Sequence, residues 1–144
     1  MSLDYVVNAF ASEMGPSKVQ ILEIKGESYA VLRLLNLPGD VGSYTLGIFN
    51  YGSIYEIGIF SHFAQFPSES EVPQWIAVLL LQSNTHSPLG AWALRDMNGE
   101  QWAFYRDLVS VTDLSSFRMR QVVVALLTEC GSFDQIVINV MKKR

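Results

Sequence analysis

Side chains able to do acid–base chemistry near neutral pH are scarce in this sequence. The two histidines, His62 and His86, each follow the end of an apolar stretch, where polar residues are expected in any case. Zinc and iron sites need clusters of histidine, cysteine or carboxylate side chains, and the sequence shows no such cluster. We therefore expect no metal site and no cofactor.

Nucleophiles and paired carboxylates are equally weak candidates. Cys130, the single cysteine, excludes an internal disulfide and falls at the predicted carboxyl end of a helix, where the dipole disfavours a thiolate. We interpret it as a buried small hydrophobe. Glu69 and Glu71 stand near a helix start, where acids are stabilised anyway, and no phosphate-binding glycine motif occurs. We predict that the protein is not an enzyme.

The charge balance argues against a nucleic-acid ligand. The chain has 14 acidic and 10 basic residues, a formal net charge of −4. A small basic patch beside Trp92 and Trp102 is conceivable, but Asp96 and Asp107 would neutralise much of it. Its members would be Arg95, Arg106, Arg118 and Arg120. We interpret these arginines as surface solubilisers and expect no nucleic-acid partner.

Length and composition predict one domain covering residues 1–144. Of the 144 residues, 49% are hydrophobic and only 17% are charged, so apolar surface is expected to remain once the core is filled. The first basic residue is Lys18, and the longest apolar run, Trp75 to Leu81, is far shorter than the roughly 20 residues of a membrane span. We expect a cytoplasmic protein that does not enter a membrane.

The first half of the chain reads as a helix followed by two hairpins. Leu3 to Met14 repeats apolar residues every three or four positions, with Ser2 as the cap and Gly15-Pro16 as the stop. Branched apolar stretches separated by short turns then predict strands. These strands are Val19–Ile24, Tyr29–Leu35, Tyr44–Tyr51 and Ile54–Phe60.

A second helix and a third hairpin follow. Ser68 with Glu71 resembles a capping box, but Ser70 is the better cap because it puts Pro73 in the first turn, where its missing N–H costs nothing. The helix ends before Pro88. Strands Leu89–Met97 and Glu100–Leu108 then pair around Asn98-Gly99, a strong hairpin signal. This turn places Trp92 opposite Tyr105 and Arg95 opposite Trp102.

The last helix is predicted to begin at the cap Ser115 and to end at Gly131. Its inward face would carry Met119, Val122, Val123, Leu126 and Cys130. The segment Phe133 to Met141 fits either a further helical turn or two or a short strand, and we favour helix.

The middle helix carries more apolar surface than one sheet can cover. It is apolar nearly all round from Trp75 to Leu81, so it must be covered on more than one side. A second copy of the chain could supply that cover. We predict a homodimer with an interface formed by Trp75, Ile76, Leu79 and Leu80.

Aromatic residues on the predicted strands are the most distinctive feature of the sequence. Both faces of the third hairpin are largely apolar, so helices on one side cannot be the whole cover. The aromatic side chains are either ordinary core or a sheet face that receives a partner. The candidate binding face consists of Trp92, Trp102, Phe104 and Tyr105.

One segment resembles a known family. The stretch Val78-Leu79-Leu80-Leu81-Gln82-Ser83-Asn84, followed by Ser87-Pro88-Leu89-Gly90-Ala91-Trp92, is similar to the YbjN family, in which a leucine-rich helix leads through such a turn into a strand. The similarity covers roughly Ser70 to Cys130. It implies the fold of type III secretion chaperones, an antiparallel sheet with helices packed on it and commonly dimeric, and it implies no catalytic residues.

These observations predict an α+β fold with the element order α-β-β-(β-β)-α-β-β-α. The expected function is a non-catalytic, chaperone-like or regulatory module that binds an apolar segment of a partner protein. The alternative is a small-ligand sensor or minor enzyme, with a pocket built around Trp92, Trp102, Tyr105 and His86.

Overall fold

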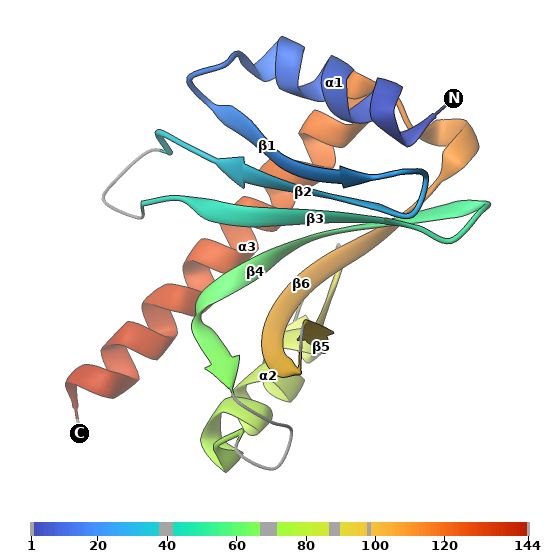
Figure 1. Ribbon diagram of the computed structural model, residues 1–144. Coiled ribbons are helices and arrows are strands. Elements are labelled where there is room, and N and C mark those ends of the chain that lie inside the picture. Colours follow the sequence, from blue (N-terminus) through green and yellow to red (C-terminus); the bar gives the residue numbers. More distant parts are fainter. Residues whose placement is uncertain (1, 38–41, 67–71, 87–89, 98, 144) are drawn as a thin grey trace.

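The computed structural model describes residues 2–37, 42–66, 72–86, 90–97 and 99–143, with the backbone alone for residues 63–65, 86 and 97. Within these residues three α-helices and six strands follow one another in the predicted order (Figure 1). The elements are α1 (Leu3–Met14), β1 (Val19–Lys25), β2 (Tyr29–Leu34), β3 (Tyr44–Asn50), β4 (Ile54–Phe66), α2 (Gln74–His86), β5 (Ala91–Met97), β6 (Glu100–Ser110) and α3 (Ser116–Lys142). A short 3₁₀ turn, Val111–Asp113, precedes α3.

The strands form one antiparallel sheet in the order β1-β2-β3-β4-β6-β5. This arrangement confirms the α+β class and all three predicted hairpins. The register of the last hairpin is also confirmed, since Trp92 pairs with Tyr105 and Arg95 with Trp102. Gly99 has a φ of +87°, the left-handed conformation that the turn requires.

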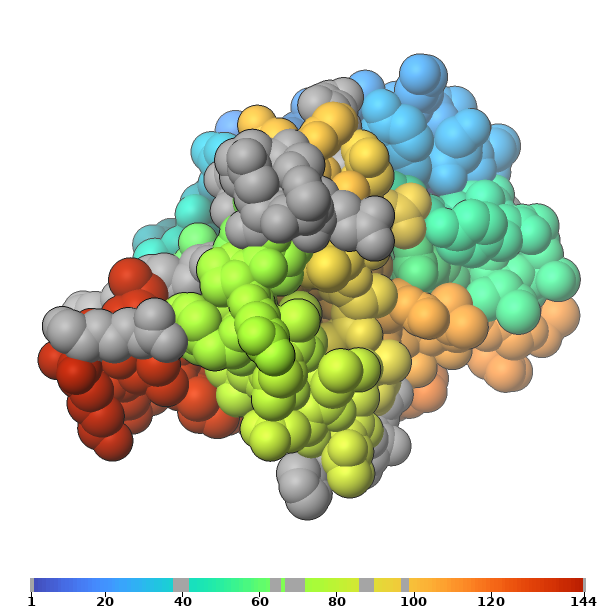
Figure 2. All heavy atoms as spheres, turned by 90° about the horizontal axis from the view of Figure 1, so that it is seen from below, coloured from blue at the N-terminus to red at the C-terminus, as the bar shows by residue number. Residues whose placement is uncertain are grey.

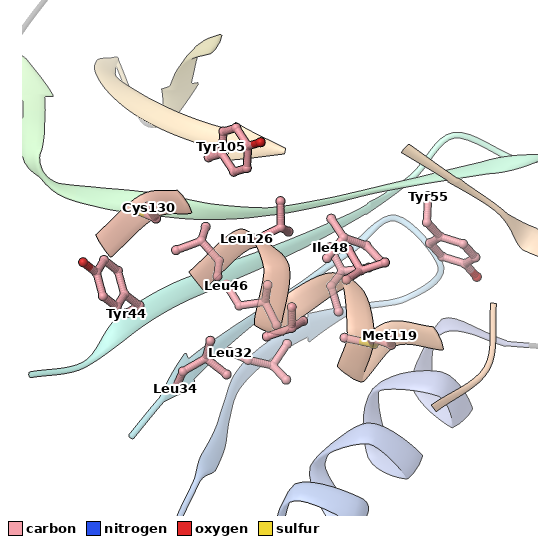
Figure 3. Packing of buried hydrophobic residues seen from close by; sticks show 14 of the residues in the cluster. Leu32, Leu34, Tyr44, Leu46, Ile48, Tyr55, Tyr105, Met119, Leu126 and Cys130 are labelled. Atoms are coloured by element: carbon pink, nitrogen blue, oxygen red, sulfur yellow. The ribbon is translucent and has the colours of Figure 1, made fainter. Parts of the chain in front are cut away.

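α1 and α3 cover the same face of the sheet. α1 packs on β1 and β2, while α3 crosses β4 and β6 and also contacts α1 (Figure 1). Figure 3 shows the core layer between the sheet and α3, in which Leu46 and Ile48 of the sheet lie against Leu126 of α3. The predicted caps of both helices are confirmed: the hydroxyl of Ser2 accepts from the Tyr5 N–H, and that of Ser115 accepts from the Arg118 N–H.

α2 lies at the other end of the sheet, beside the edge strand β5. It begins at Gln74, so Pro73 precedes the helix and does not stand in its first turn as predicted. The Pro73 carbonyl accepts hydrogen bonds from the N–H groups of Ile76 and Ala77. The predicted cap Ser70, like its alternatives Ser68 and Glu71, lies outside the described residues.

The predicted end of α3 at Gly131 was wrong, because the helix continues to Lys142. The inward stripe that begins at Met119 continues past the glycine through Phe133 and Val137, so burial on the sheet maintains the helix. Gly131 does not have a positive φ. The helical alternative for Phe133 to Met141 is therefore confirmed, as the end of one long helix.

β4 is longer than predicted and reaches Phe66 instead of stopping at Phe60. Its pairing with β6 is irregular between Phe60 and Gln65, and the regular alternation of apolar residues stops at that irregularity.

By length and composition α3 is apolar enough to cross a membrane, and it is the one such helix among the described residues. Core helices of soluble proteins meet the same description, so this observation is weak evidence for a membrane span.

Candidate functional site

The four residues of the predicted binding face lie on opposite sides of the sheet. Trp92 and Tyr105 are buried on the helix-covered face, where the Trp92 ring lies 4.2 Å from that of Phe133 in α3 and 5.0 Å from that of Tyr105. Trp102 and Phe104 belong to a separate cluster on the other face. The predicted binding face was therefore wrong as a single surface, because neighbouring residues of a strand point to opposite faces.

We call the sheet face opposite α1 and α3 the open face, because no residue of a described helix joins its apolar cluster. Three buried rings form the centre of this aromatic cluster: Phe49 of β3, Phe60 of β4 and Phe104 of β6. The centroid of the Phe104 ring lies 4.6 Å from the centroid of the Phe60 ring and 5.9 Å from that of the Phe49 ring. Tyr29 and Trp102 pack at its margin.

A glycine makes room for the central ring. Gly58 lies on β4 between Glu56 and Phe60 on the open face, and a Cβ atom there would overlap the ring of Phe104. The absent side chain allows the ring to lie across the neighbouring strand, which is a common reason for glycine inside a strand.

A charged triad of Glu56, Arg95 and Arg106 lies beside the aromatic cluster. Glu56 is only 7% exposed and pairs with a terminal nitrogen of Arg95 and, at 3.2 Å, with Nε of Arg106. The Tyr51 hydroxyl donates to the same carboxylate at 3.3 Å. The guanidinium carbon of Arg95 lies 3.4 Å from the centroid of the Phe49 ring, a cation–π contact.

The open face combines this triad with exposed apolar side chains. Tyr51, Ile54 and Leu108 are all more than a third exposed, and Leu108 is the register partner of Glu56. Arginine and aromatic residues are enriched in protein interfaces, where they anchor a partner. Such a surface can bind an apolar group and an anion side by side.

Arg95 and Arg106 pair with Glu56 and not with Asp96 or Asp107, the acids predicted to neutralise them. The Asp96 carboxylate accepts from the Gly99 N–H and from the Gln101 amide, and that of Asp107 accepts from the Leu108 N–H. Neither acid pairs with an arginine among the described residues. The four arginines form no single patch, since Arg118 and Arg120 lie on α3.

Glu56 was missed as a site residue. It is 39 residues from Arg95 in the sequence, so no local spacing links the two side chains. The available signal was a carboxylate between Tyr55 and Ile57 in an otherwise apolar strand, because a buried charge requires a partner.

A second polar cluster lies on the helix-covered face, around the buried carboxylate of Asp134 in α3. It accepts hydrogen bonds from the hydroxyls of Tyr44, at 2.6 Å, and Ser61, and from the His62 backbone N–H at 3.3 Å. The His62 ring stacks on that of Tyr44 at 3.9 Å. Burial, and then the hydrogen bond to Asp134, raise the pKa of Tyr44 above its ordinary value.

The hydroxyl and the carboxylate at the centre of this cluster are enclosed by the protein. Ser61 is 1% exposed and its hydroxyl donates to the buried Asp134 carboxylate, so the hydroxyl is not accessible from solvent. Burial raises the pKa of the Cys130 thiol, and the side chain lies in the main core, which confirms it as a buried small hydrophobe. Among the described residues no group of histidine, cysteine and carboxylate side chains could hold a metal ion.

Two of the four residues predicted for the dimer interface face the chain's own core. Ile76 is 2% exposed and Leu80 is 7% exposed, so neither is available to a partner. Trp75 and Leu79 are half-buried and line an open hollow of about 610 Å³, together with Val140 of α3. Figure 2 shows α2 at the surface beside the C-terminal end of α3.

The exposed apolar residues of α2 are instead Val78 and Leu81, the latter 69% exposed. The pocket of the alternative hypothesis is not assembled from its predicted residues, because Trp102 and Trp92 lie on opposite faces. The fourth member, the side chain of His86, lies outside what the structure describes.

Fold and site together define an α+β protein whose antiparallel sheet is covered by helices on one face and carries an aromatic and charged cluster on the other. Comparison with protein-family models, curated proteins and solved structures finds no match.

Proposed function

We propose that the protein is a non-catalytic interaction module that binds an apolar segment of a partner protein on its open face. The observation that carries this proposal is the exposure of Ile54 and Leu108 directly beside Arg95, Glu56 and Arg106. Exposed apolar side chains next to a preformed charged group are typical of protein-binding surfaces.

The fixed position of the Arg95 side chain supports a role for this surface in binding. Hydrogen bonds and ion pairs hold Arg95 to both Tyr51 and Glu56, and its guanidinium rests on Phe49. Side chains fixed in this way lose little conformational entropy when a partner binds, so more of the contact energy appears as affinity.

A non-catalytic role fits the environments of the described nucleophiles. The Ser61 hydroxyl and the Cys130 thiol are both buried on the helix-covered face, away from the open face. The alternative of a small-ligand sensor has less support, because its predicted pocket residues are divided between the two faces.

We also propose that two copies associate through the outer surface of α2. The resemblance to YbjN proteins and type III secretion chaperones implies a dimer, and the apolar composition of α2 favours this helix as the contact. α2 contains no Asp, Glu, Lys or Arg, so two copies related by a twofold axis would bring no like charges together. The contact would be made by Val78 and Leu81 and not by the buried Ile76 and Leu80.

Site-specific photo-crosslinking tests the open-face proposal. A benzophenone amino acid replaces Leu108 on the open face or, as the control, the exposed Phe117 on α3, and extracts of the producing cells are irradiated. We expect a protein adduct of discrete mass from position 108 only. This adduct should disappear when Trp102→Ala is added, and a thermal unfolding curve shows whether that variant is still folded at the temperature of the experiment.

Three results would contradict the proposal. The first is equal adducts from both positions, and the second is no adduct from position 108. The third is an adduct whose added mass is that of a small molecule, which would favour the ligand-sensor alternative.

A further inference from the structure

We propose that the segment bound on the open face carries an acidic side chain, and that this carboxylate pairs with Arg106 while neighbouring apolar residues contact Ile54 and Leu108. This inference rests on the proposed function and specifies the chemistry of the partner. It follows from the charges on the open face and from the geometry of Arg106.

The charged triad has one positive charge in excess. Two guanidinium groups share the single carboxylate of Glu56, and all three side chains are at least two-thirds buried. Partly desolvated charges are stabilised when they are balanced by an opposite charge. A second carboxylate, supplied by the partner, would complete this balance.

Arg106 is the arginine that remains available for it. It reaches Glu56 through Nε, so its two terminal nitrogens have no partner among the described residues. Two parallel terminal N–H groups match the two oxygens of a carboxylate, the geometry that makes arginine–carboxylate pairs strong and directional. Arg95, by contrast, already uses a terminal nitrogen for Glu56 and for Tyr51.

An acidic polypeptide fits this surface better than an anionic membrane or a second copy of the chain. Membrane surfaces are recognised by clusters of several basic residues, whereas this triad has one net positive charge and lies beside the exposed Tyr51, Ile54 and Leu108. A symmetric contact between two open faces would bring two net positive groups together.

The test uses display libraries of short random peptides, selected on wild type, on Arg106→Gln and on Arg118→Gln. Arg118→Gln is the matched control, since it removes the same charge from α3. Arg106→Gln is expected to fold, because Glu56 keeps its pair with Arg95. A thermal unfolding curve checks this.

We expect wild type and Arg118→Gln to enrich apolar peptides with Asp or Glu at a fixed position. In calorimetric titrations with a selected peptide, Arg106→Gln and replacement of the peptide's acid by its amide should each weaken binding about ten- to a hundredfold. Combining both changes should add little more, which marks a direct pair.

Enrichment of apolar peptides without an acid, bound equally by Arg106→Gln, would overturn this inference and leave the proposed function intact. A fourth selection uses Leu108→Asp, which places a charge on the exposed apolar part of the open face. A failure of wild type to enrich any peptide over Leu108→Asp would overturn both. Sedimentation of wild type, but not of Arg106→Gln, with phosphatidylserine-containing vesicles would assign the site to an anionic membrane. Conversion of a dimer to a monomer by Arg106→Gln would assign it to a second copy.

Discussion

At the scale of single residues, the buried carboxylate of Asp134 is stabilised by three donors that come from β4 and from Tyr44 of β3. The Tyr44→Phe substitution keeps the ring that stacks on His62 and removes one of these donors. We expect the free energy of unfolding at pH 7 to fall by about 1–3 kcal/mol, because a buried charged acceptor loses a hydrogen bond. Urea unfolding measures this loss. Tyr5→Phe, which removes an exposed hydroxyl, should have almost no effect.

The same substitution should change the response to alkali. The pKa of Tyr44 is raised in the folded protein, so above about pH 10 the unfolded chain releases this proton first and stability falls as pH rises. The raised pKa of Cys130 acts in the same direction. Wild type should therefore lose stability above about pH 9 to 10, and Tyr44→Phe should lose less. Equal slopes in the two proteins would contradict this assignment.

The sequence predicts less at this scale than at the scale of elements. Asp134 lies in a segment whose sequence fits either helix or strand, with helix favoured, and its donors Tyr44 and Ser61 are 90 and 73 residues away. The charged triad is hidden for the same reason, since Glu56 is brought to Arg95 and Arg106 only by the strand order β4-β6-β5. Pairing across a sheet is a property of topology, which local spacing does not encode.

At the scale of elements, two glycines with opposite roles give a matched pair of substitutions. A Cβ atom at Gly58 in β4 would overlap Phe104, whereas one at Gly131 in α3 would meet nothing within 4 Å. We expect Gly58→Ala to cost about 1–3 kcal/mol through overpacking. Gly131→Ala should instead stabilise the protein by about 0.5–1 kcal/mol, because alanine favours helix. Urea unfolding tests both, and a shift of the same sign in the two variants would contradict the structure.

Elements with a strong local signal were predicted well. Turn chemistry around Gly99 and the alternation of apolar residues fixed the hairpins and the register of β5 with β6. The predicted end of α3 was wrong because tertiary burial outweighs a local stop signal. The predicted end of β4 was wrong because the apolar alternation stops at the irregular pairing after Phe60, whereas the strand continues to Phe66. Gly131 remains helical because Cys130 and Phe133 on either side of it are buried against the sheet.

At the scale of the whole molecule, the proposed dimer depends on the outer surface of α2. Leu81→Asp places a charge on that surface without touching the core, because Leu81 is 69% exposed. We expect a monomer of unchanged melting temperature by light scattering and thermal unfolding. Phe117→Asp, an equally exposed site on α3, should leave the dimer intact. A monomeric wild type, or a dimer that tolerates Leu81→Asp, would contradict the proposal.

The side chain of Asn84 in α2 makes a contact that bears on how copies of this protein can meet. Its amide accepts from the N–H of Trp92 and donates to the Trp92 carbonyl, so it occupies the main-chain hydrogen-bonding groups of a residue on the edge strand β5. Exposed strand edges are where foreign chains add on and start fibrillar aggregates. Because Asn84 of α2 occupies these groups, another chain cannot form hydrogen bonds with β5 at Trp92 and extend the sheet there.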